Sequence, residues 1–260
     1  MTTKAKPITL HGKPIAAGAM PVICTPLVGR DRETVLAEAA TALPKHPNVL
    51  EWRVDFFDRL EDTERVIDTA RALKATAKDV PLLFTRRAHE EGGQRVALSE
   101  PRVVQLYEAV CAARCVDLID YELSHPGEAF ARLREVSRRH EIALVGSYHN
   151  FQATPPVPAM VATFRDAQTR GADVGKVAVM PRSPSDVLAL LAATLEASNT
   201  LEIPLISMSM GPVGSVSRMV GGVFGSALTF AVGKASSAPG QVPIEDLRAV
   251  LAAVHRATGM

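Results

Sequence analysis

The chain has 260 residues, 47% of them hydrophobic and 22% charged, which is enough apolar material for one sizeable core. Its 29 basic and 28 acidic residues nearly cancel and form no long run of like charge, so a nucleic-acid partner is excluded and a small solute is favoured. The opening MTTKAKPITLHG has no apolar signal core, and no stretch approaches the roughly 18 apolar residues of a membrane span. We therefore expect a cytoplasmic protein with no membrane contact.

The three cysteines are too few and too unevenly spaced for a disulfide framework. Cys111 and Cys115, in CAARC, lack the second pair of ligands that a zinc site needs. We expect both to lie on one helix as small core residues.

In chain order, ITLHGKPIAAG predicts a small hairpin that turns at His11-Gly12 and plugs one end of the fold. Apolar, β-rich runs then begin near residues 21, 48, 81, 117, 142, 173, 204 and 225. Helical periodicity fills six of the intervals between these runs: RETVLAEAATAL, TERVIDTARALKATA, EPRVVQLYEAVCAA, EAFARLREVSRRH, VPAMVATFRDAQTRG and SPSDVLALLAATLEAS. Ser99 and Ser183, each just before a proline, predict helix starts, and Gly171 predicts the end of the fifth helix.

Strand and helix alternate about eight times with a spacing near 30 residues. This rhythm predicts an α/β protein built as one (β/α)8 barrel over residues 1–260, with an N-terminal β-hairpin. The main rival is a doubly wound open sheet, but the turn after the first strand, TPLVGRD, holds a single glycine instead of a dinucleotide fingerprint.

Alternation along the predicted strands places the charges on one face. Residues two apart in a strand share a side, so Glu51, Arg53 and Asp55 lie together, as do Asp120 with Glu122 and Ser147 with His149. The apolar faces pack against helices, which leaves the charged faces inside the barrel, near the carboxyl ends of the strands where barrel enzymes build their sites. A structural ion pair on each strand is the alternative, although burying many charges costs several kcal/mol per unpaired ion.

Lys176 lies in the middle of the apolar strand DVGKVAVM, on the same side as Val174 and Ala178. The alternative to a functional role is a salt-bridged lysine near the barrel rim. The functional interpretation is a Schiff-base lysine, because desolvation and nearby positive charge favour the neutral, nucleophilic form of an amine. His149 ends the preceding strand and is then a candidate general acid and base. No histidine pair has metal-ligand spacing, and imine chemistry requires neither metal nor cofactor.

The set EWRVD, TRRAHEEGG, SYHNF, GKVAVMP, SMSMG, SRMVGGVFGSALTF and SSAPGQ resembles the type I 3-dehydroquinate dehydratases, the imine-forming lyases of the shikimate pathway. The resemblance runs from about residue 48 to residue 241 and follows the order of the motifs. It implies an imine between Lys176 and the C3 ketone of 3-dehydroquinate. It also implies that His149 removes the C2 proton and returns it to the departing C1 hydroxyl, while Glu91 orients the histidine. It suggests a homodimer.

The resemblance implies the substrate-binding residues as well. Arg218 matches the arginine that binds the substrate carboxylate; Met208 and Met210 match an apolar wall, with core packing as their alternative role. Glu51, Arg53 and Arg87 match residues that hold ring hydroxyls and the polar floor, and Ser237 and Gln241 match a closing loop. The TRRAHEEGG turn also offers Arg86 and Glu90, which remain alternatives to Arg87 and Glu91.

Two other functions remain as alternatives. A class I Schiff-base aldolase acting on a keto acid or sugar phosphate would keep the barrel and the lysine, but such enzymes often bind phosphate through glycine-rich turns after strands seven and eight. A catalytically silent binding barrel would be expected to lack the lysine or the histidine, and both are present.

Overall fold

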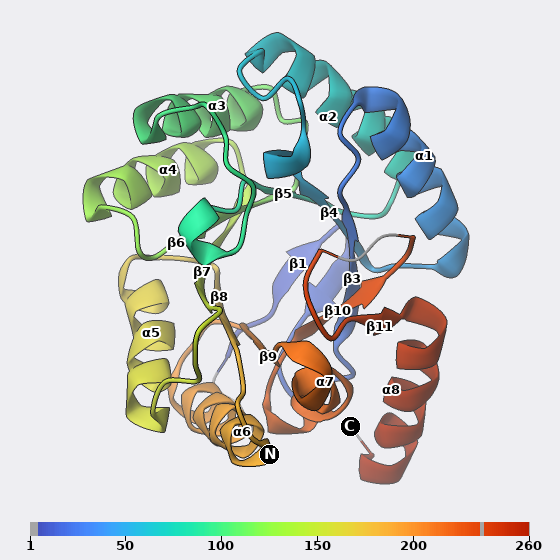
Figure 1. Ribbon diagram of the computed structural model, residues 1–260, viewed down its shortest axis with the longest axis vertical. Helices are drawn as coiled ribbons and strands as arrows, with labels where there is room; N and C mark the ends of the chain where they lie inside the picture. The colour runs from blue at the N-terminus through green and yellow to red at the C-terminus, as the bar shows by residue number, and fades with distance from the viewer. Residues whose placement is uncertain (1–4, 235–236, 260) are drawn as a thin grey trace.

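The computed structural model describes residues 5–234 and 237–259, and its central feature is a ring of parallel strands enclosed by helices (Figure 1). The (β/α)8 barrel predicted from the alternation of strand and helix is confirmed. In ring order the strands are β10 (Leu228–Val232), β3 (Val22–Leu27), β4 (Val49–Arg53), β5 (Leu82–Thr85), β6 (Leu118–Glu122), β7 (Ala143–Asn150), β8 (Val174–Val179) and β9 (Leu205–Ser209). A short strand, β11 (Val242–Pro243), pairs outside the ring with β10.

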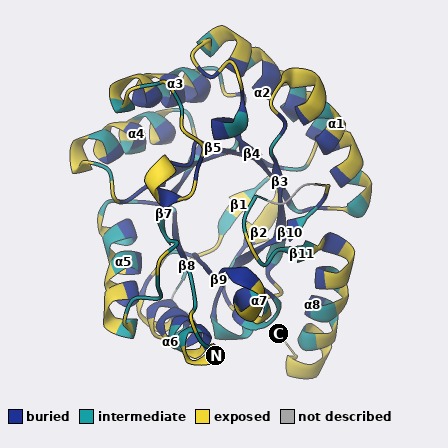
Figure 2. Cartoon of the chain, viewed as in Figure 1, coloured by how far each residue is buried: buried dark blue, intermediate teal, exposed yellow. Residues whose placement is uncertain are grey.

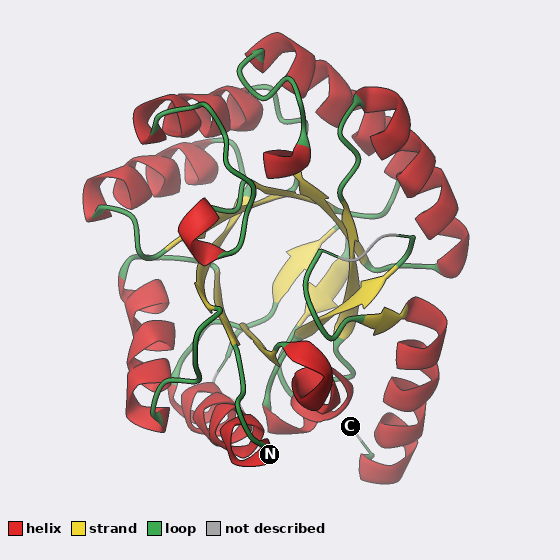
Figure 3. Cartoon of the chain, viewed as in Figure 1, coloured by secondary structure: helices red, strands yellow, loops and turns green. Residues whose placement is uncertain are grey.

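The helices lie outside the strands, and Figure 3 separates the two layers clearly. They are α1 (Arg32–Ala42), α2 (Thr63–Ala77), α3 (Glu100–Ala112), α4 (Gly127–Arg139), α5 (Val157–Thr169), α6 (Pro184–Thr200), α7 (Gly211–Val220) and α8 (Ile244–Thr258). The first six correspond to the segments with helical periodicity, whereas α7 and α8 were not among the predicted helices. Four single-turn 3₁₀ helices complete the described chain: η1 (Leu43–Lys45), η2 (Val54–Phe56), η3 (His89–Glu91) and η4 (Gly221–Phe224).

The predicted helix starts at Ser99 and Ser183 and the predicted helix end at Gly171 are confirmed, whereas the predicted place of Cys115 is wrong. Gly171 follows the last turn of α5 with a positive φ of 82°. Ser99 occupies the N-cap position of α3, but its side chain makes no capping hydrogen bond. Cys115 does not share a helix with Cys111 as expected, because α3 ends at Ala112 and Cys115 lies in the following turn; both thiols are free and buried.

The barrel closes between β9 and β10 with less pairing than elsewhere. These strands share one isolated bridge, Leu205 with Ser226, and the backbone N–H of Ala227 donates to the carbonyl of Leu205 at 2.7 Å. The Ser226 hydroxyl supplies hydrogen bonds that strand backbones form elsewhere in the ring. It accepts the N–H of Ser207 at 3.1 Å and donates to the carbonyl of Leu228. One side chain therefore helps to complete the ring.

The outer core lies between the sheet and the helices, and in Figure 2 the helices are buried where they face the strands. A row of edge-to-face aromatic contacts joins Trp52 to Phe84, Phe84 to Tyr107 and Tyr107 to Tyr121, with centroid distances of 5.1–5.9 Å. Such contacts add to the free energy gained by burying the rings. They make β4, β5 and β6 a rigid wall for the side chains that point inward.

Inside the barrel, the inward-facing side chains change from apolar to polar along each strand. Near the amino ends the inward residues are apolar, as with Val49, Leu83, Leu118, Val145 and Val174, and the hairpin of β1 (Ile8–Leu10) and β2 (Lys13–Ile15) packs against this layer. The hairpin turns at His11-Gly12 as predicted, and His11 bonds Asp117 just before β6. Two residues further along the same strands, the inward positions are Glu51, Thr85, Asp120, Ser147 and Lys176. The closed, apolar end thus supports a polar layer above it.

Candidate active site

A cavity opens at the carboxyl ends of the strands. It is lined by ten of the eleven residues singled out from the sequence: Glu51, Arg53, Arg87, Glu91, His149, Lys176, Met208, Met210, Ser237 and Gln241. The eleventh, Arg218, lies behind Met208. The structure also brings in residues that sequence reasoning missed, namely Gly92, Phe151, Ala178, Phe230 and Ala238. All five lie within the motifs quoted above, which also hold residues that were singled out.

Strand register explains how Lys176 and His149 meet. In the β7–β8 pairing, Ser147 lies opposite Lys176 and His149 lies opposite Ala178, so both functional side chains face inward. His149 is one pleat closer to the barrel mouth, about 6–7 Å along the strand direction. Both side chains line the same cavity and not opposite faces of the barrel wall.

Lys176 is ion-paired, which differs from the uncharged amine expected from the sequence. Its Nζ donates to Oδ2 of Asp120 at 2.8 Å and lies 3.9 Å from Oε1 of Glu51. The ring of Phe230 lies beneath the ammonium at 4.9 Å from its centroid. Two carboxylates and an aromatic face all favour a cation here, so the amine must release its proton before it can attack a carbonyl.

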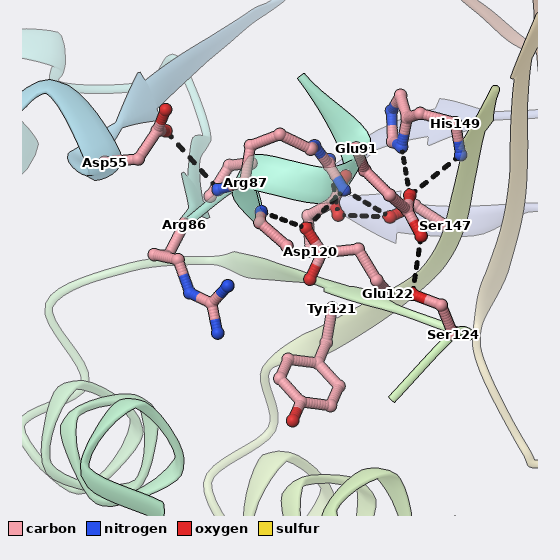
Figure 4. A network of polar contacts seen from close by, with 12 residues as sticks. Asp55, Arg86, Arg87, Glu91, Asp120, Tyr121, Glu122, Ser124, Ser147 and His149 are labelled. Atoms are coloured by element: carbon pink, nitrogen blue, oxygen red, sulfur yellow. Dashed lines mark hydrogen bonds and ion pairs between the residues drawn. The ribbon is translucent and has the colours of Figure 1, made fainter. Parts of the chain in front are cut away.

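Arg87 joins the buried carboxylates into one network, which Figure 4 shows from close by. Its guanidinium donates to Asp120 at 2.7 Å, to Glu122 at 2.9 Å and to the hydroxyl of Ser147 at 2.8 Å. Burial alone would raise the pKa of Asp120, but Arg87 and Lys176 outweigh that effect and hold the pKa far below its usual range. Burial also acts to raise the pKa of Glu122, but Arg87 and then the hydrogen bond to His125 outweigh it, so this pKa is lowered as well. Both carboxylates therefore stay ionised.

Glu91 and His149 form a hydrogen-bonded pair at the cavity wall. Oε2 of Glu91 accepts the backbone N–H of His149 at 2.8 Å and lies 2.9 Å from ring Nδ1, while Oε1 accepts the Ser124 hydroxyl at 2.6 Å. Burial lowers the pKa of His149 well below its usual value, and Arg87 and Lys176 lower it further. Burial raises the pKa of Glu91 to about 7 against the opposing effects of Arg87 and Ser124. An ionised Glu91 fixes the proton on Nδ1 and leaves Nε2 as a base.

The turn between β5 and α3 distinguishes the alternatives that the sequence left open. Arg87 and Glu91 point into the network, whereas Arg86 points away in Figure 4 and pairs with Glu100 at the start of α3. Glu90 is exposed. Gly93 makes the turn possible, because a Cβ there would lie 1.9 Å from the carbonyl oxygen of Arg87.

Arg218, on α7, is fully buried yet has no ionic partner among the described residues. Its Nη2 donates to the carbonyl of Pro239 at 3.2 Å, its Nη1 contacts the sulfur of Met208, and its Nε has no partner in the described chain. Burial lowers the pKa of Arg218 to about 10, so it is charged at neutral pH. A buried, unpaired guanidinium is costly unless an anion joins it.

The loop at residues 237–241 contributes Ser237, Ala238 and Gln241 to the lining of the cavity. Arg53 donates to the carbonyl of Ser237 at 3.3 Å and is held from behind by Asp55 through two bonds of 2.8 and 2.9 Å. Gln241 and Ser237 bond each other through side chain and backbone. Asp55 lies beyond the end of β4, in η2, so its place beside Arg53 comes from the 3₁₀ turn and not from strand alternation. Ser236, the first letter of SSAPGQ, lies outside the described residues.

Within residues 5–234 and 237–259, no group of three or more histidine, cysteine, aspartate or glutamate side chains could hold a metal ion. No helix in the same residues has the length and apolar character needed to cross a membrane.

Fold and site together define the class: a (β/α)8-barrel protein with a buried lysine and a histidine sharing one cavity at the carboxyl ends of its strands. The family model described as type I 3-dehydroquinase matches residues 23–258. The chain is 56% identical to the 3-dehydroquinate dehydratase of Albidiferax ferrireducens over 98% of this chain and 97% of that protein. The chain belongs to the type I 3-dehydroquinase family.

Solved structures agree with this assignment. The crystal structure of 3-dehydroquinate dehydratase from Geobacillus kaustophilus superposes with a TM-score of 0.95 at 46% identity, covering all of both chains. The type I 3-dehydroquinate dehydratase from Clostridium difficile, solved with covalent modified comenic acid, superposes with a TM-score of 0.93 at 34% identity and covers 98% of this chain and 99% of that one.

Proposed function

We propose that this chain dehydrates 3-dehydroquinate to 3-dehydroshikimate, a lyase reaction of the shikimate pathway, through an imine on Lys176. The observation that carries the proposal is that a buried lysine and a neutral histidine line one cavity, and that a buried arginine with no ionic partner among the described residues contacts Met208 of the cavity wall. Family membership supports the substrate, and the covalently modified compound in the Clostridium difficile structure is in keeping with covalent chemistry.

Lys176 acts as the nucleophile. After its ammonium releases a proton, Nζ attacks the C3 ketone, and loss of water gives an imine. A protonated imine draws electrons more strongly than a ketone, so the neighbouring C2 proton becomes acidic enough for an imidazole to remove. The closed, apolar base of the barrel and the aromatic ring of Phe230 shield the nitrogen from bulk water.

His149 carries the proton transfers. Its Nε2 takes the C2 proton to give an enamine and then delivers a proton to the departing C1 hydroxyl, which leaves as water. Glu91 holds Nδ1, so that each transfer uses Nε2, and stabilises the imidazolium between the two steps. His149 then assists hydrolysis of the product imine, which regenerates Lys176.

The remaining residues hold the substrate. Arg218, which has no carboxylate partner in the described part of the chain, donates to the substrate carboxylate in a bidentate pair. Glu51 and Arg53 contact ring hydroxyls, and Arg87, already engaged by Asp120 and Glu122, serves as the polar floor. Met208 and Met210 form the apolar wall, and Ser237 and Gln241 close the loop over the ring.

Borohydride trapping tests the imine. Reduction in the presence of 3-dehydroquinate or 3-dehydroshikimate is expected to add mass to the peptide that contains Lys176, because hydride fixes the imine as a stable amine. Lys176→Ala is expected to lose the adduct and to show no turnover in a spectrophotometric assay for the conjugated enone. Lys13→Ala, an exposed lysine at the other end of the barrel, is the control and should retain both. An unmodified Lys176 peptide during turnover would refute the proposal.

The same assays separate the alternatives. Cleavage of sugar phosphates or keto acids without dehydration would replace the lyase by a class I aldolase. Binding of 3-dehydroquinate with neither adduct nor product would replace it by a silent barrel.

The proposal extends to the protein as a whole. Residues 1–260 form one domain, the chain functions as a homodimer in the cytoplasm, and the reaction uses no cofactor. Family resemblance supports the dimer, and the chemistry of the imine supports the lack of a cofactor. Sedimentation of the purified chain measures the dimer directly.

A further inference from the structure

Asp120 is a buried carboxylate that the proposed reaction does not yet use. It lies in the middle of β6, and its side chain has no exposed surface. Its two oxygens have different partners: Oδ1 accepts Arg87 at 2.7 Å and the Ser147 hydroxyl at 2.6 Å, whereas Oδ2 accepts Lys176 at 2.8 Å. Arg87 and Ser147 therefore fix the carboxylate in place whether or not Lys176 remains bound.

The surroundings single out Asp120 as the direct partner of Lys176. Glu51, the other nearby carboxylate, lies 3.9 Å away, beyond hydrogen-bond distance, and its Oε1 accepts the hydroxyl of Thr85. The other titratable or charged groups around the pair are Glu122 on β6 itself and, from three further elements, Cys24 on β3, Arg87 and Glu91 after β5, and His149 on β7.

The charge balance of imine formation shows whether the contact between Asp120 and the nitrogen of Lys176 can persist during the reaction. When an ammonium and a ketone condense to a protonated imine, two protons leave with the carbonyl oxygen as water. The nitrogen then keeps one proton and one positive charge. The charge opposite Asp120 is therefore the same before and after condensation, and an anchored Oδ2 can accept a hydrogen bond from either form.

We propose that Asp120 is the counter-ion of the imine, a positioning residue that keeps the nitrogen of Lys176 protonated while His149 works at C2. The inference rests on the proposed imine at Lys176. A neutral imine withdraws electrons poorly, so loss of the nitrogen proton would remove the reason for forming the imine. A carboxylate at hydrogen-bond distance in a buried site holds that proton to higher pH.

The test measures the protonation of the imine nitrogen. With ¹⁵N-lysine-labelled protein and 3-dehydroshikimate, the nitrogen chemical shift distinguishes the protonated imine from the neutral one as pH rises. Asp120→Asn keeps the shape and the contact to Ser147 but removes the charge, and it is expected to lower the midpoint of this titration by about one pH unit or more. It is also expected to lower kcat about 10²- to 10³-fold, with the alkaline limb of the rate profile moving by the same amount.

Matched variants separate a counter-ion from a structural role. Glu122→Gln removes another buried carboxylate that binds Arg87 but not Lys176, and it should move the titration by less than half as much. Asp120→Glu retains the charge and should restore most of the wild-type midpoint. A kcat that falls equally at every pH in Asp120→Asn, with an unmoved titration, would overturn the inference.

Two further outcomes are decisive. If Asp120→Asn does not fold, the wild-type titration decides, because an imine nitrogen that loses its proton near neutral pH has no effective counter-ion. Absence of any wild-type adduct would reject the imine itself, whereas an adduct at Lys176 with an unmoved midpoint in Asp120→Asn rejects the counter-ion alone.

Discussion

At the scale of single residues, the site is governed by how burial and charge act on individual groups. Burial removes Glu91 and His149 from water, and Arg87 is close to both groups. The pKa of Glu91 is nevertheless raised, whereas the pKa of His149 is lowered. Desolvation favours the uncharged form of each group, so the pKa of the acid rises and the pKa of the imidazole falls. The imidazole is therefore neutral and ready to act as a base, while the carboxylate ionises only near neutral pH.

Glu91 is expected to set the acid limb of the pH profile. Because its pKa is about 7, kcat/KM in the wild type should rise with pH around a midpoint near 7, where Glu91 becomes able to hold Nδ1–H. Glu91→Gln should lose that limb and lower kcat by about 10²-fold. Steady-state kinetics across pH measures both, and Glu90→Gln, the exposed neighbour, is the control. A wild-type limb that persists in Glu91→Gln would assign it to another group.

The same group has a consequence for stability. The pKa of Glu91 in the folded protein lies above its ordinary value of 4.5, so the stability that Glu91 contributes is complete below pH 4.5 and is lost as pH rises through 7. The free energy of unfolding of Glu91→Gln relative to wild type should therefore increase by up to about 3 kcal/mol between pH 4 and pH 8. Urea unfolding at the two pH values measures the difference, and no change between them would contradict the raised pKa.

At the scale of elements, the loop at residues 237–241 depends on close backbone contact with the start of α7. Pro239 accepts the N–H of Gly211 and also Nη2 of Arg218, so the loop orients the arginine that we propose for the substrate carboxylate. Gly240 has a φ of 76°, and a Cβ on it would lie 2.2 Å from the carbonyl oxygen of Gly211. A side chain at this position is incompatible with the closed loop.

Gly240→Ala is thus expected to raise KM roughly tenfold, about 1.4 kcal/mol of substrate binding, with a smaller effect on kcat. Steady-state kinetics at saturating and limiting 3-dehydroquinate measures the two constants. Gly12→Ala provides a matched control, because Gly12 also has a positive φ but a Cβ on it would meet no atom within 4 Å, and it lies in the hairpin. An unchanged KM in Gly240→Ala would mean that closure of the loop does not contribute to binding.

At the scale of the whole molecule, the ring of strands is weakest between β9 and β10. Ser226→Ala would leave the buried N–H of Ser207 without its partner, so we expect a loss of about 1–3 kcal/mol in the free energy of unfolding. Urea unfolding followed by circular dichroism measures the loss, and a single transition would support one domain. Ser215→Ala is the control, because this half-buried serine on α7 donates to the carbonyl of Pro212 within its own helix. Equal stabilities of the two variants would show that the hydroxyl does not hold the seam.

The sequence alone predicted the barrel because apolar strands and amphipathic helices alternate regularly, and it predicted six helices whose periodicity is plain. It missed α7, whose glycines and proline have low helix propensity, and α8, which was not recognised despite its acidic first turn and apolar stripe. Strand alternation was sufficient to place Glu51, Lys176 and His149 inside, because period two fixes the face of each side chain.

Tertiary structure decided what the charges do. Neighbouring strands fix which side chains meet, so only the fold could show that Lys176 pairs with Asp120 and that Arg87 and not Arg86 holds the network. Only the fold could show, likewise, that Arg218 is buried with no ionic partner among the residues that the structure describes. These facts depend on distances between residues 33 to 56 positions apart, or on burial by distant loops, which no local pattern encodes. Local sequence therefore determined the kinds of side chain and the faces they occupy, whereas packing determined their partners and their protonation.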